Sequence, residues 1–262
     1  MTIAARKMLT RTVDQHVAVL TMDSPPVNAL APELLSELEA AFENLVGEET
    51  VRAVVLTGTG RYFMAGADVR VLASIQSSRE GMDMALRGQA ILNKIEAYKK
   101  PVLAAINGVC LGAGLELALC CHIRLAADGA RLGQPEINLG IMPGFGATQR
   151  LPRLIGRSRA VEMILTGDPI SAQEAKAVGL VSHVVPAESL VHQAVGLARR
   201  IAGKGQVAVR SVLRGILEGE GMELREGLAL EARLFGGLCD TQDKKEGLAA
   251  FLEKRQPRFT DR

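Results

Sequence analysis

The sequence predicts an α/β body followed by an all-helical region, and two observations lead to this fold class. Short runs rich in β-branched residues, such as 51–57 and 102–106, alternate with stretches that carry apolar residues at helical spacing. From about residue 190 to the end the pattern is helical, and no strand signal remains. We therefore expect a body over residues 1–195 and a helical region over residues 196–262.

The individual elements follow from local patterns along the chain. Strands are expected at 16–22, 51–57, 102–106, 123–127, 132–137 and 181–185. Helices are expected at 32–46, at about 79–99, at 113–121 and after residue 171. Pro32 is favoured in the first turn of the first helix, and Gly47 ends that helix. Ser171 and Glu174 form a capping box for the last of these helices, which Gly179 ends.

Composition excludes several classes of protein. With 262 residues, 48% hydrophobic and 23% charged, the chain has ample material for one large globular domain. A net charge of +2 without a basic cluster, and only 3% aromatic residues, argue against a nucleic-acid partner. The first residues contain no apolar signal region, so we expect a cytoplasmic protein. The apolar stretch 101–121 is better explained by a strand, a tight Asn-Gly turn and a short buried helix than by a membrane span.

The four cysteines predict neither a metal site nor a disulfide framework. Cys110, Cys120 and Cys121 fall in one apolar stretch, where cysteine usually behaves as a small buried hydrophobe, and a reducing compartment is favoured. Adjacent cysteines on a helix point in different directions, and no second Cys/His pair lies near His122 at ligand spacing. Dinucleotide, phosphate-loop and nucleophile-elbow motifs are also missing from the sequence.

Two glutamates, Glu116 and Glu136, are the best candidates for catalytic residues. Each lies in a segment that is rich in glycine and poor in other charges. A carboxylate in such apolar surroundings is costly to bury unless it is paired or has a chemical task. Two of them in one cleft can share the acid and base steps of a proton transfer. The alternative for each glutamate is a helix cap or a turn position.

Small residues in the segments 63–69 and 112–114 predict a site for a negatively charged oxygen. The segments 63–69 and 112–114 each follow an expected strand, and small residues let the backbone approach a ligand. The second segment also begins a helix, where free N–H groups favour negative charge. Two N–H donors aimed at one point form an oxyanion hole, which suits a carbonyl that becomes an enolate. The alternative is that these glycines only make tight turns.

Motifs along essentially the whole chain resemble those of the crotonase family, and most closely those of enoyl-CoA hydratases. They are Asn28-Ala29-Leu30, Ala65-Gly66-Ala67-Asp68, the segment 101–116, Gly133-Gln134-Pro135-Glu136, and the segments 139–144, 148–151, 165–167, 175–181 and 251–255. The resemblance implies a crotonase-type spiral of ββα units with a C-terminal helical trimerisation region. Homotrimers or dimers of trimers are therefore expected. The substrate implied is an acyl-CoA, with no cofactor besides the coenzyme A that the substrate carries.

The resemblance also implies a role for individual residues. The N–H groups of Ala67 and Ala113 would bind the thioester oxygen, and alanine replaces the more usual glycine at position 113. Glu116 would orient and activate a water molecule, and Glu136 would supply a proton to C2 of a 2-enoyl-CoA. The remaining implied site residues are Gly144 near the catalytic water, and Val27, Ala65, Asp68, Val69, Phe251 and Lys254 as coenzyme A contacts. Residues from about 71 to 90 would line the acyl pocket.

Two departures and two alternatives accompany this interpretation. Cys121-His122 replaces a more usual Cys-Asp, and the segment 23–27 differs from the commoner Asn-Arg-Pro, which bears on the contacts of Val27. The first alternative is another reaction on the same scaffold, such as isomerisation, decarboxylation, dehalogenation or thioester hydrolysis. The second alternative is a non-catalytic RNA-binding homologue, against which the composition argues. The helical region carries apolar faces that we expect to be buried between subunits; they include Leu224, Leu228, Leu230, Leu234, Phe235 and Leu238.

Overall fold

The structure, a computed structural model, describes residues 6–262 and contains a large and a small β-sheet. The six-stranded sheet has the order β1 (Leu9–Asp14), β2 (Val17–Met22), β3 (Ala53–Gly58), β5 (Val102–Ile106), β7 (Ile123–Ala127) and β10 (His183–Val185). Only the β1–β2 pair in it is antiparallel. The four-stranded sheet has the order β4 (Tyr62–Met64), β6 (Val109–Leu111), β8 (Arg131–Gly133) and β9 (Ile170–Ser171).

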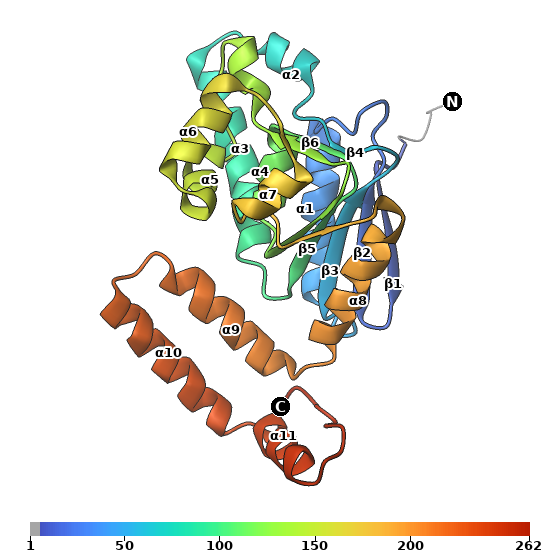
Figure 1. Cartoon of the computed structure of the whole chain (residues 1–262), viewed down its shortest axis with the longest axis vertical. Helices are drawn as coiled ribbons and strands as arrows, with labels where there is room; N and C mark the ends of the chain where they lie inside the picture. The colour runs from blue at the N-terminus through green and yellow to red at the C-terminus, as the bar shows by residue number, and fades with distance from the viewer. Residues whose placement is uncertain (1–5) are drawn as a thin grey trace.

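A repeated ββα unit connects the two sheets. In the pairs β3–β4, β5–β6 and β7–β8, the first strand enters the large sheet and the second enters the small one. A helix follows each pair; these helices include α2 (Val69–Ser74), α3 (Ser78–Glu96), α4 (Ala113–Leu119) and the 3₁₀ helix η1 (Pro135–Leu139). This arrangement confirms the spiral of ββα units that the sequence predicts. It also gathers the ends of the short strands, with the helices that follow them, in one part of the body (Figure 1).

Two apolar layers cover the large sheet. Alternate residues of β3 point to opposite faces, so that Leu56 packs with one cluster and Val55 with the other. The first cluster includes α1 (Pro32–Val46), α3 and α4. The second is formed with α8 (Leu190–Ala202), which packs against the central strands. The other helices of the body are α5 (Ala147–Ile155), α6 (Arg157–Thr166), α7 (Ala172–Ala177) and the 3₁₀ helix η2 (Ala187–Ser189).

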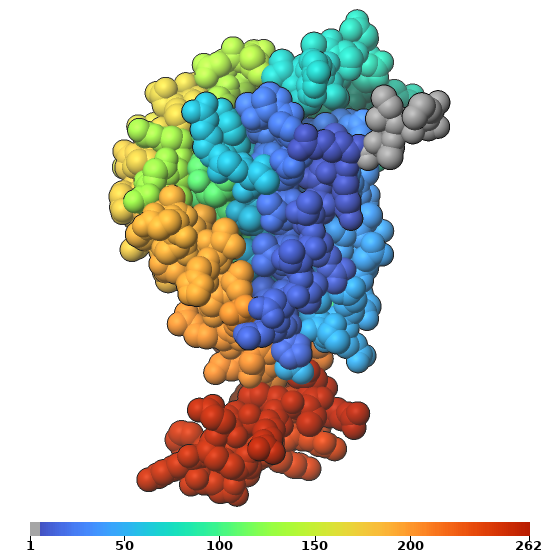
Figure 2. Space-filling view, turned by 90° about the vertical axis from the view of Figure 1, so that its right-hand side faces the viewer, coloured from blue at the N-terminus to red at the C-terminus, as the bar shows by residue number. Residues whose placement is uncertain are grey.

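The last three helices form an arm, defined here as residues 206–262, while residues 6–205 form the body. The arm contains α9 (Gln206–Gly219), α10 (Leu224–Cys239) and α11 (Gln242–Leu252). Helices α9 and α10 pack on each other, and the arm projects beyond the body at one end of the molecule (Figures 1 and 2). The boundary expected at residue 195 falls inside α8, and the assignment of an oligomerisation role to the C-terminal region stays a prediction.

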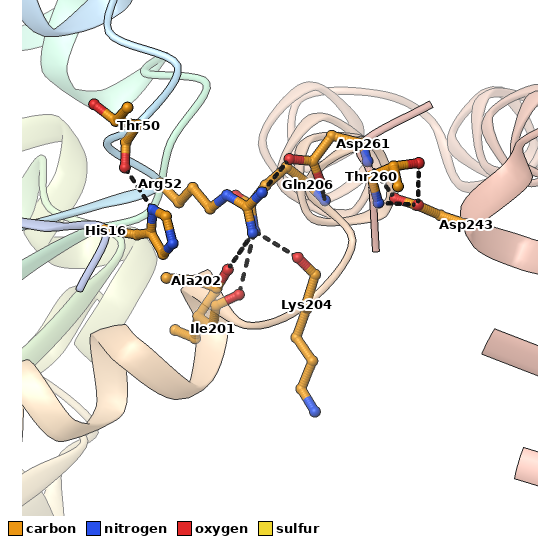
Figure 3. Close-up of polar contacts among 10 residues, drawn as sticks. All are labelled: His16, Thr50, Arg52, Ile201, Ala202, Lys204, Gln206, Asp243, Thr260 and Asp261. Carbon is orange, nitrogen blue, oxygen red and sulfur yellow. Dashed lines mark hydrogen bonds and ion pairs between the residues drawn. The ribbon is translucent and has the colours of Figure 1, made fainter. Parts of the chain in front are cut away.

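A small polar cluster joins the arm to the body (Figure 3). The carboxylate of Asp261 accepts hydrogen bonds from Nη2 of Arg52 at 2.7 Å and from the backbone N–H of Gln206 at 2.9 Å. The Gln206 amide donates to the carbonyl oxygen of Lys204 at 2.7 Å, which fixes the turn between α8 and α9. Asp243 on α11 accepts from the N–H groups of Thr260 and Asp261, so the end of the chain is tied to both regions.

The structure confirms most of the expected elements and corrects one of them. The strand expected at 132–137 is wrong beyond Gly133, because Pro135 begins a 3₁₀ helix that carries Glu136. Proline has no N–H for a strand ladder and fits the first turn of a helix. The capping box of Ser171 and Glu174 is confirmed. The sequence analysis missed β1, β4, β6, β9, α2, α5 and α6, and helical structure ends at Leu252, before the end of the chain.

Candidate active site

A pocket of about 1120 Å³ lies in the body between α2, α3, α4, η1 and the loop 141–146. Glu116 and Glu136 both line this pocket, although they come from different ββα units. The backbone segment 65–67 and the beginning of α4 line it as well. The structure therefore brings together the two carboxylates and the two small-residue segments that the sequence analysis singled out.

Glu116 is held in a single position by the backbone of a neighbouring loop. Its side chain is buried, and its Oε1 accepts hydrogen bonds from the N–H groups of Phe145 at 2.8 Å and Ala147 at 3.0 Å. Burial raises the pKa of Glu116, whereas the hydrogen bonds from Ala147 and Phe145 act in the opposite direction. These two N–H groups stabilise the ionised form of Glu116 in apolar surroundings, so its carboxylate can act as a base.

Glu136 has a more strongly shifted pKa, which lies at about 7. Burial is the main cause, and the nearby negative charge of Glu116 adds to it. The side chain of Gln134, whose amide orientation is assigned from its partners, donates from its nitrogen to both carboxylate oxygens at 3.0 Å. A Cβ on Gly112 would lie 2.8 Å from Oε1 of Glu136, so glycine gives this carboxylate its space. Glu136 is therefore a group that can hold and release a proton near neutral pH.

The loop that binds Glu116 is itself fixed by side chains from α3 and α5. Arg150 donates to the carbonyl oxygen of Phe145 at 3.0 Å and makes a two-point ion pair with Glu96 at 2.9 and 2.7 Å. The amide of Gln89 donates to the carbonyl oxygen of Gly144 at 2.8 Å. The orientation of Glu116 thus depends on a chain of contacts that reaches well outside the pocket.

Two backbone N–H groups beside the carboxylates lack partners. Among residues 6–262, neither Ala67 nor Ala113 donates its amide N–H to another group of the chain. Ala113 is the first residue of α4, where a helix leaves its N–H groups free, and Gly112 before it has φ +52°. Gly66, with φ +114°, turns the backbone just before Ala67. Both donors border the pocket that holds the glutamates.

The other predicted site residues of the body lie at or near this pocket. Gly144, Ala65 and Val69 line it. Val27 is one step away, since its carbonyl oxygen accepts the N–H of Ala65 at 3.2 Å. Asp68 caps α2 through the N–H of Arg70 and also pairs with the Arg70 side chain, which holds its pKa below the usual range. The carboxylate of Asp68 is therefore explained by its role in capping α2.

Phe251 and Lys254 do not join the pocket within one chain. Phe251 lies near the end of α11 with 80% of its surface exposed, and Lys254 follows that helix with φ +55°. Neither residue lines the pocket, and α11 lies at the end of the molecule away from α2 (Figure 1). Their assignment as coenzyme A contacts stays a prediction.

Sequence reasoning missed the residues that hold the two glutamates in place. Gln134 was quoted only as part of a motif, and no role was predicted for Phe145, Ala147 or Arg150. A signal was present at Gly144-Phe145-Gly146-Ala147, where glycines precede a helix and leave N–H groups free. No group of three or more His, Cys, Asp or Glu side chains that could hold a metal occurs within residues 6–262, and no helix there is long and apolar enough to cross a membrane.

The fold and the pocket together define an α/β enzyme of the ββα-spiral class. Comparison with known proteins then gives the family. The sequence profile described as "Enoyl-CoA hydratase/isomerase" matches residues 12–262. The chain belongs to the enoyl-CoA hydratase/isomerase family.

Individual relatives agree with this assignment. The chain is 44% identical to a "Probable enoyl-CoA hydratase" of Bacillus subtilis over 94% of this chain and 96% of that protein. It is 43% identical to a "Crotonyl-CoA hydratase" of Syntrophomonas wolfei over 94% and 95% of the two chains. Among solved structures, an enoyl-CoA hydratase from Bacillus anthracis superimposes with a TM-score of 0.94 at 40% identity, covering 98% of this chain and all of that one.

Proposed function

We propose that this protein hydrates 2-trans-enoyl-CoA thioesters to 3-hydroxyacyl-CoA. The observation that carries the proposal is the pair of Glu116 and Glu136 in one pocket beside two unpartnered backbone N–H groups. Family membership and relatives named as hydratases support the same reaction. A place in fatty-acid β-oxidation or related acyl-CoA catabolism follows from this chemistry.

The two glutamates divide the proton transfers between them. Glu116, ionised and fixed by the loop, accepts a proton from water while the water oxygen bonds to C3. Glu136, whose pKa of about 7 keeps a large fraction protonated near neutral pH, gives its proton to C2 as the double bond is lost. The proton that Glu116 gains and the proton that Glu136 loses are restored by exchange with solvent, so one water is added across the double bond.

The backbone donors stabilise the charge that develops between these steps. When water adds at C3, the thioester oxygen carries enolate charge until C2 is protonated. The N–H groups of Ala67 and Ala113 are free to donate to this oxygen, and the positive end of the α4 dipole adds to the effect. Gly144 lies in the same pocket and is proposed as the neighbour of the attacking water.

The remaining parts of the proposal concern coenzyme A and assembly. Val27, Ala65, Asp68 and Val69 are proposed to border the coenzyme A entrance, with no cofactor beyond the substrate. Phe251 and Lys254 would reach the adenine and phosphate end from a second copy in a homotrimer or dimer of trimers. A cytoplasmic location is proposed, in keeping with the three buried free thiols of Cys110, Cys120 and Cys121.

Double-bond isomerisation on the same scaffold is the alternative reaction. An isomerase that works with one carboxylate would not require both Glu116 and Glu136. Hydration and isomerisation are therefore distinguished by replacing each glutamate with glutamine, which keeps the shape of the side chain and removes the transferable proton. A positioned general acid or base contributes about 10²- to 10⁴-fold to the rate.

We expect Glu116→Gln and Glu136→Gln each to lower the hydration rate by at least that order. The double variant should lose much less than the product of the two, because groups acting on one water are not additive. Binding of a saturated acyl-CoA, measured by calorimetry, should survive in all three variants. Near-full activity in one single variant with loss in the other would favour isomerisation. Absence of hydration in the native protein would overturn the proposal.

A further inference from the structure

A second cavity lies next to the proposed acyl pocket and shares part of its lining. It measures about 310 Å³ and lies between the beginning of α1, α2 and α3. Ala67, Leu72, Met84 and Phe145 line both spaces. Because the same side chains face both, they form the partition between the two.

Phe145 is the bulkiest of these shared residues, and its ring is fixed from behind by a glycine. The ring is buried, and a Cβ on Gly88 would lie 2.4 Å from its Cε1 atom. Gly88 is in the middle of α3, where glycine is less favourable than alanine. The close approach of the ring gives a packing reason for this residue, and it leaves the ring no room to withdraw toward α3.

The second cavity is suited to a hydrocarbon chain. Its lining includes Leu30, Leu35, Val71 and Leu72, and the charged residues Asp68, Asp83 and Arg87 also contribute. Most of the lining residues are apolar. The second cavity adjoins the first pocket at Ala67, whose N–H is proposed to donate to the thioester oxygen. An acyl chain whose thioester is bound at Ala67 therefore lies beside the partition.

We propose that Phe145, seated on Gly88, is a specificity-determining residue that keeps the acyl tail of the substrate out of this second cavity. The proposal rests on the proposed hydration of enoyl-CoA. Removal of the ring joins the two spaces, and the tail of a longer 2-enoyl-CoA then gains apolar contacts. Each additional buried methylene group contributes about fourfold to binding.

The test compares kcat/KM for a twelve-carbon and a four-carbon 2-enoyl-CoA. The ratio of the two is the readout, because a general loss of activity affects both substrates alike. Phe145→Ala keeps the backbone N–H that binds Glu116 and should raise the ratio by on the order of tenfold or more. Met142→Ala, which enlarges the first pocket away from the second cavity, is the matched control and should leave the ratio nearly unchanged.

A second arm of the experiment uses the Gly88 contact. Gly88→Ala should lower thermal stability because its methyl group meets the ring, whereas the same change should cost little in the Phe145→Ala background. If Phe145→Ala does not fold, Phe145→Leu carries the test, with a smaller rise in the ratio. An unchanged ratio, or an equal rise in Met142→Ala, overturns this inference alone. A native protein without hydratase activity overturns the proposed function, and this inference with it.

Discussion

A carboxylate of the body and one of the arm have pKa values that are shifted in opposite directions. In the body, burial raises the pKa of Glu136 to about 7, and the hydrogen-bond donors around it keep it in place. In the arm, Glu246 pairs with Arg255 and accepts the N–H of Arg258, which lower its pKa to about 2. Among the described residues, the two carboxyls whose pKa burial raises, Glu116 and Glu136, thus lie in one pocket, whereas Glu246 of the arm is paired with an arginine.

The two regions also differ in how they use apolar side chains. In the body, the strands and helices bury most of their leucines and valines in two clusters, although some, such as Val46 and Leu165, stay exposed. In the arm, large apolar side chains stay exposed in the single chain; they include Val212, Ile216, Leu224, Leu228, Phe235, Leu248 and Leu252. A soluble monomer seldom exposes so many together. The body has two buried apolar clusters of its own, and we expect a second copy of the chain to cover the exposed apolar side chains of the arm.

The largest effect is expected when a charge is introduced among the exposed apolar side chains of the arm. We expect Phe235→Asp to dissociate a trimer or hexamer of the native protein, because it buries an unpaired charge in the predicted interface. Light scattering at micromolar concentration measures the mass. Val46→Asp, at an equally exposed position of the body, is the matched control and should leave the assembly unchanged. A monomeric native protein would contradict the predicted assembly.

The pH dependence of the rate tests the site in the body. Glu136 must be protonated to act as the acid, so kcat/KM should fall by about tenfold per pH unit above pH 7. An acid limb should appear where Glu116 takes up its proton, above the pH of an ordinary glutamate because burial raises its pKa. A kcat/KM that stays constant from pH 6 to pH 9 would show that Glu136 is not the acid.

The same pKa shift predicts a change in stability with a definite sign. A carboxyl whose folded pKa is raised stabilises the fold below its unfolded pKa, and this contribution is lost as the pH rises through about 7. Glu136→Gln should therefore gain stability relative to the native protein at pH 8 and lose this advantage near pH 5. Thermal unfolding at the two pH values measures the difference.

A smaller effect on affinity is expected at Lys254, which we predict to connect the arm with the coenzyme A site. Lys254→Ala should raise KM by roughly tenfold with little change in kcat, because a phosphate contact is made equally in ground and transition states. Lys176→Ala, another exposed lysine, is the control. If a partner copy supplies Lys254, the effect should vanish in the Phe235→Asp background. A loss of kcat at constant KM would contradict this placement.

Features that depend on residues close together in the sequence were predicted better than features that depend on contacts between distant segments. Pro32, the capping box at Ser171 and the buried strand at 102–106 are local signals, and they were correct. The pair of Glu116 and Glu136 was also found, because glycine-rich segments around single charges are visible along the chain. Pro135 was a local signal as well, and it should have ended the strand at Gly133.

Other features depend on contacts between distant segments, and these were missed. Nothing near Arg150 in the sequence indicates that it would bind Glu96 and the carbonyl oxygen of Phe145. The three-residue strands β4 and β6 are too short to show a period, and they exist because they pair across the spiral. The reason for a glycine at position 88 likewise becomes clear only when the ring of Phe145 is seen against it.

The smallest expected effect concerns the ion pair that joins the two regions. Arg52 and Asp261 lie 2.7 Å apart, and about a quarter of each side chain remains exposed, at 22% and 24%. Asp261→Asn keeps one oxygen for the Gln206 N–H but removes the charge and replaces the oxygen that accepts from Arg52 with an NH2 group (Figure 3). We expect a loss of about 1 kcal/mol or less, which 1 M salt should reduce further. Hydrogen exchange should show faster opening of α9 and α11 amides, with the strands of the body unaffected.

The matched control is Asp14→Asn, which breaks the pair of Asp14 and Arg199 inside the body. That pair is more exposed, and α8 packs on the large sheet through its apolar face without it. Asp14→Asn should therefore leave exchange in the arm unchanged. If both variants behave alike, the polar cluster does not hold the arm to the body. We would then expect the orientation of the arm to depend mainly on a second copy of the chain that covers its apolar side chains.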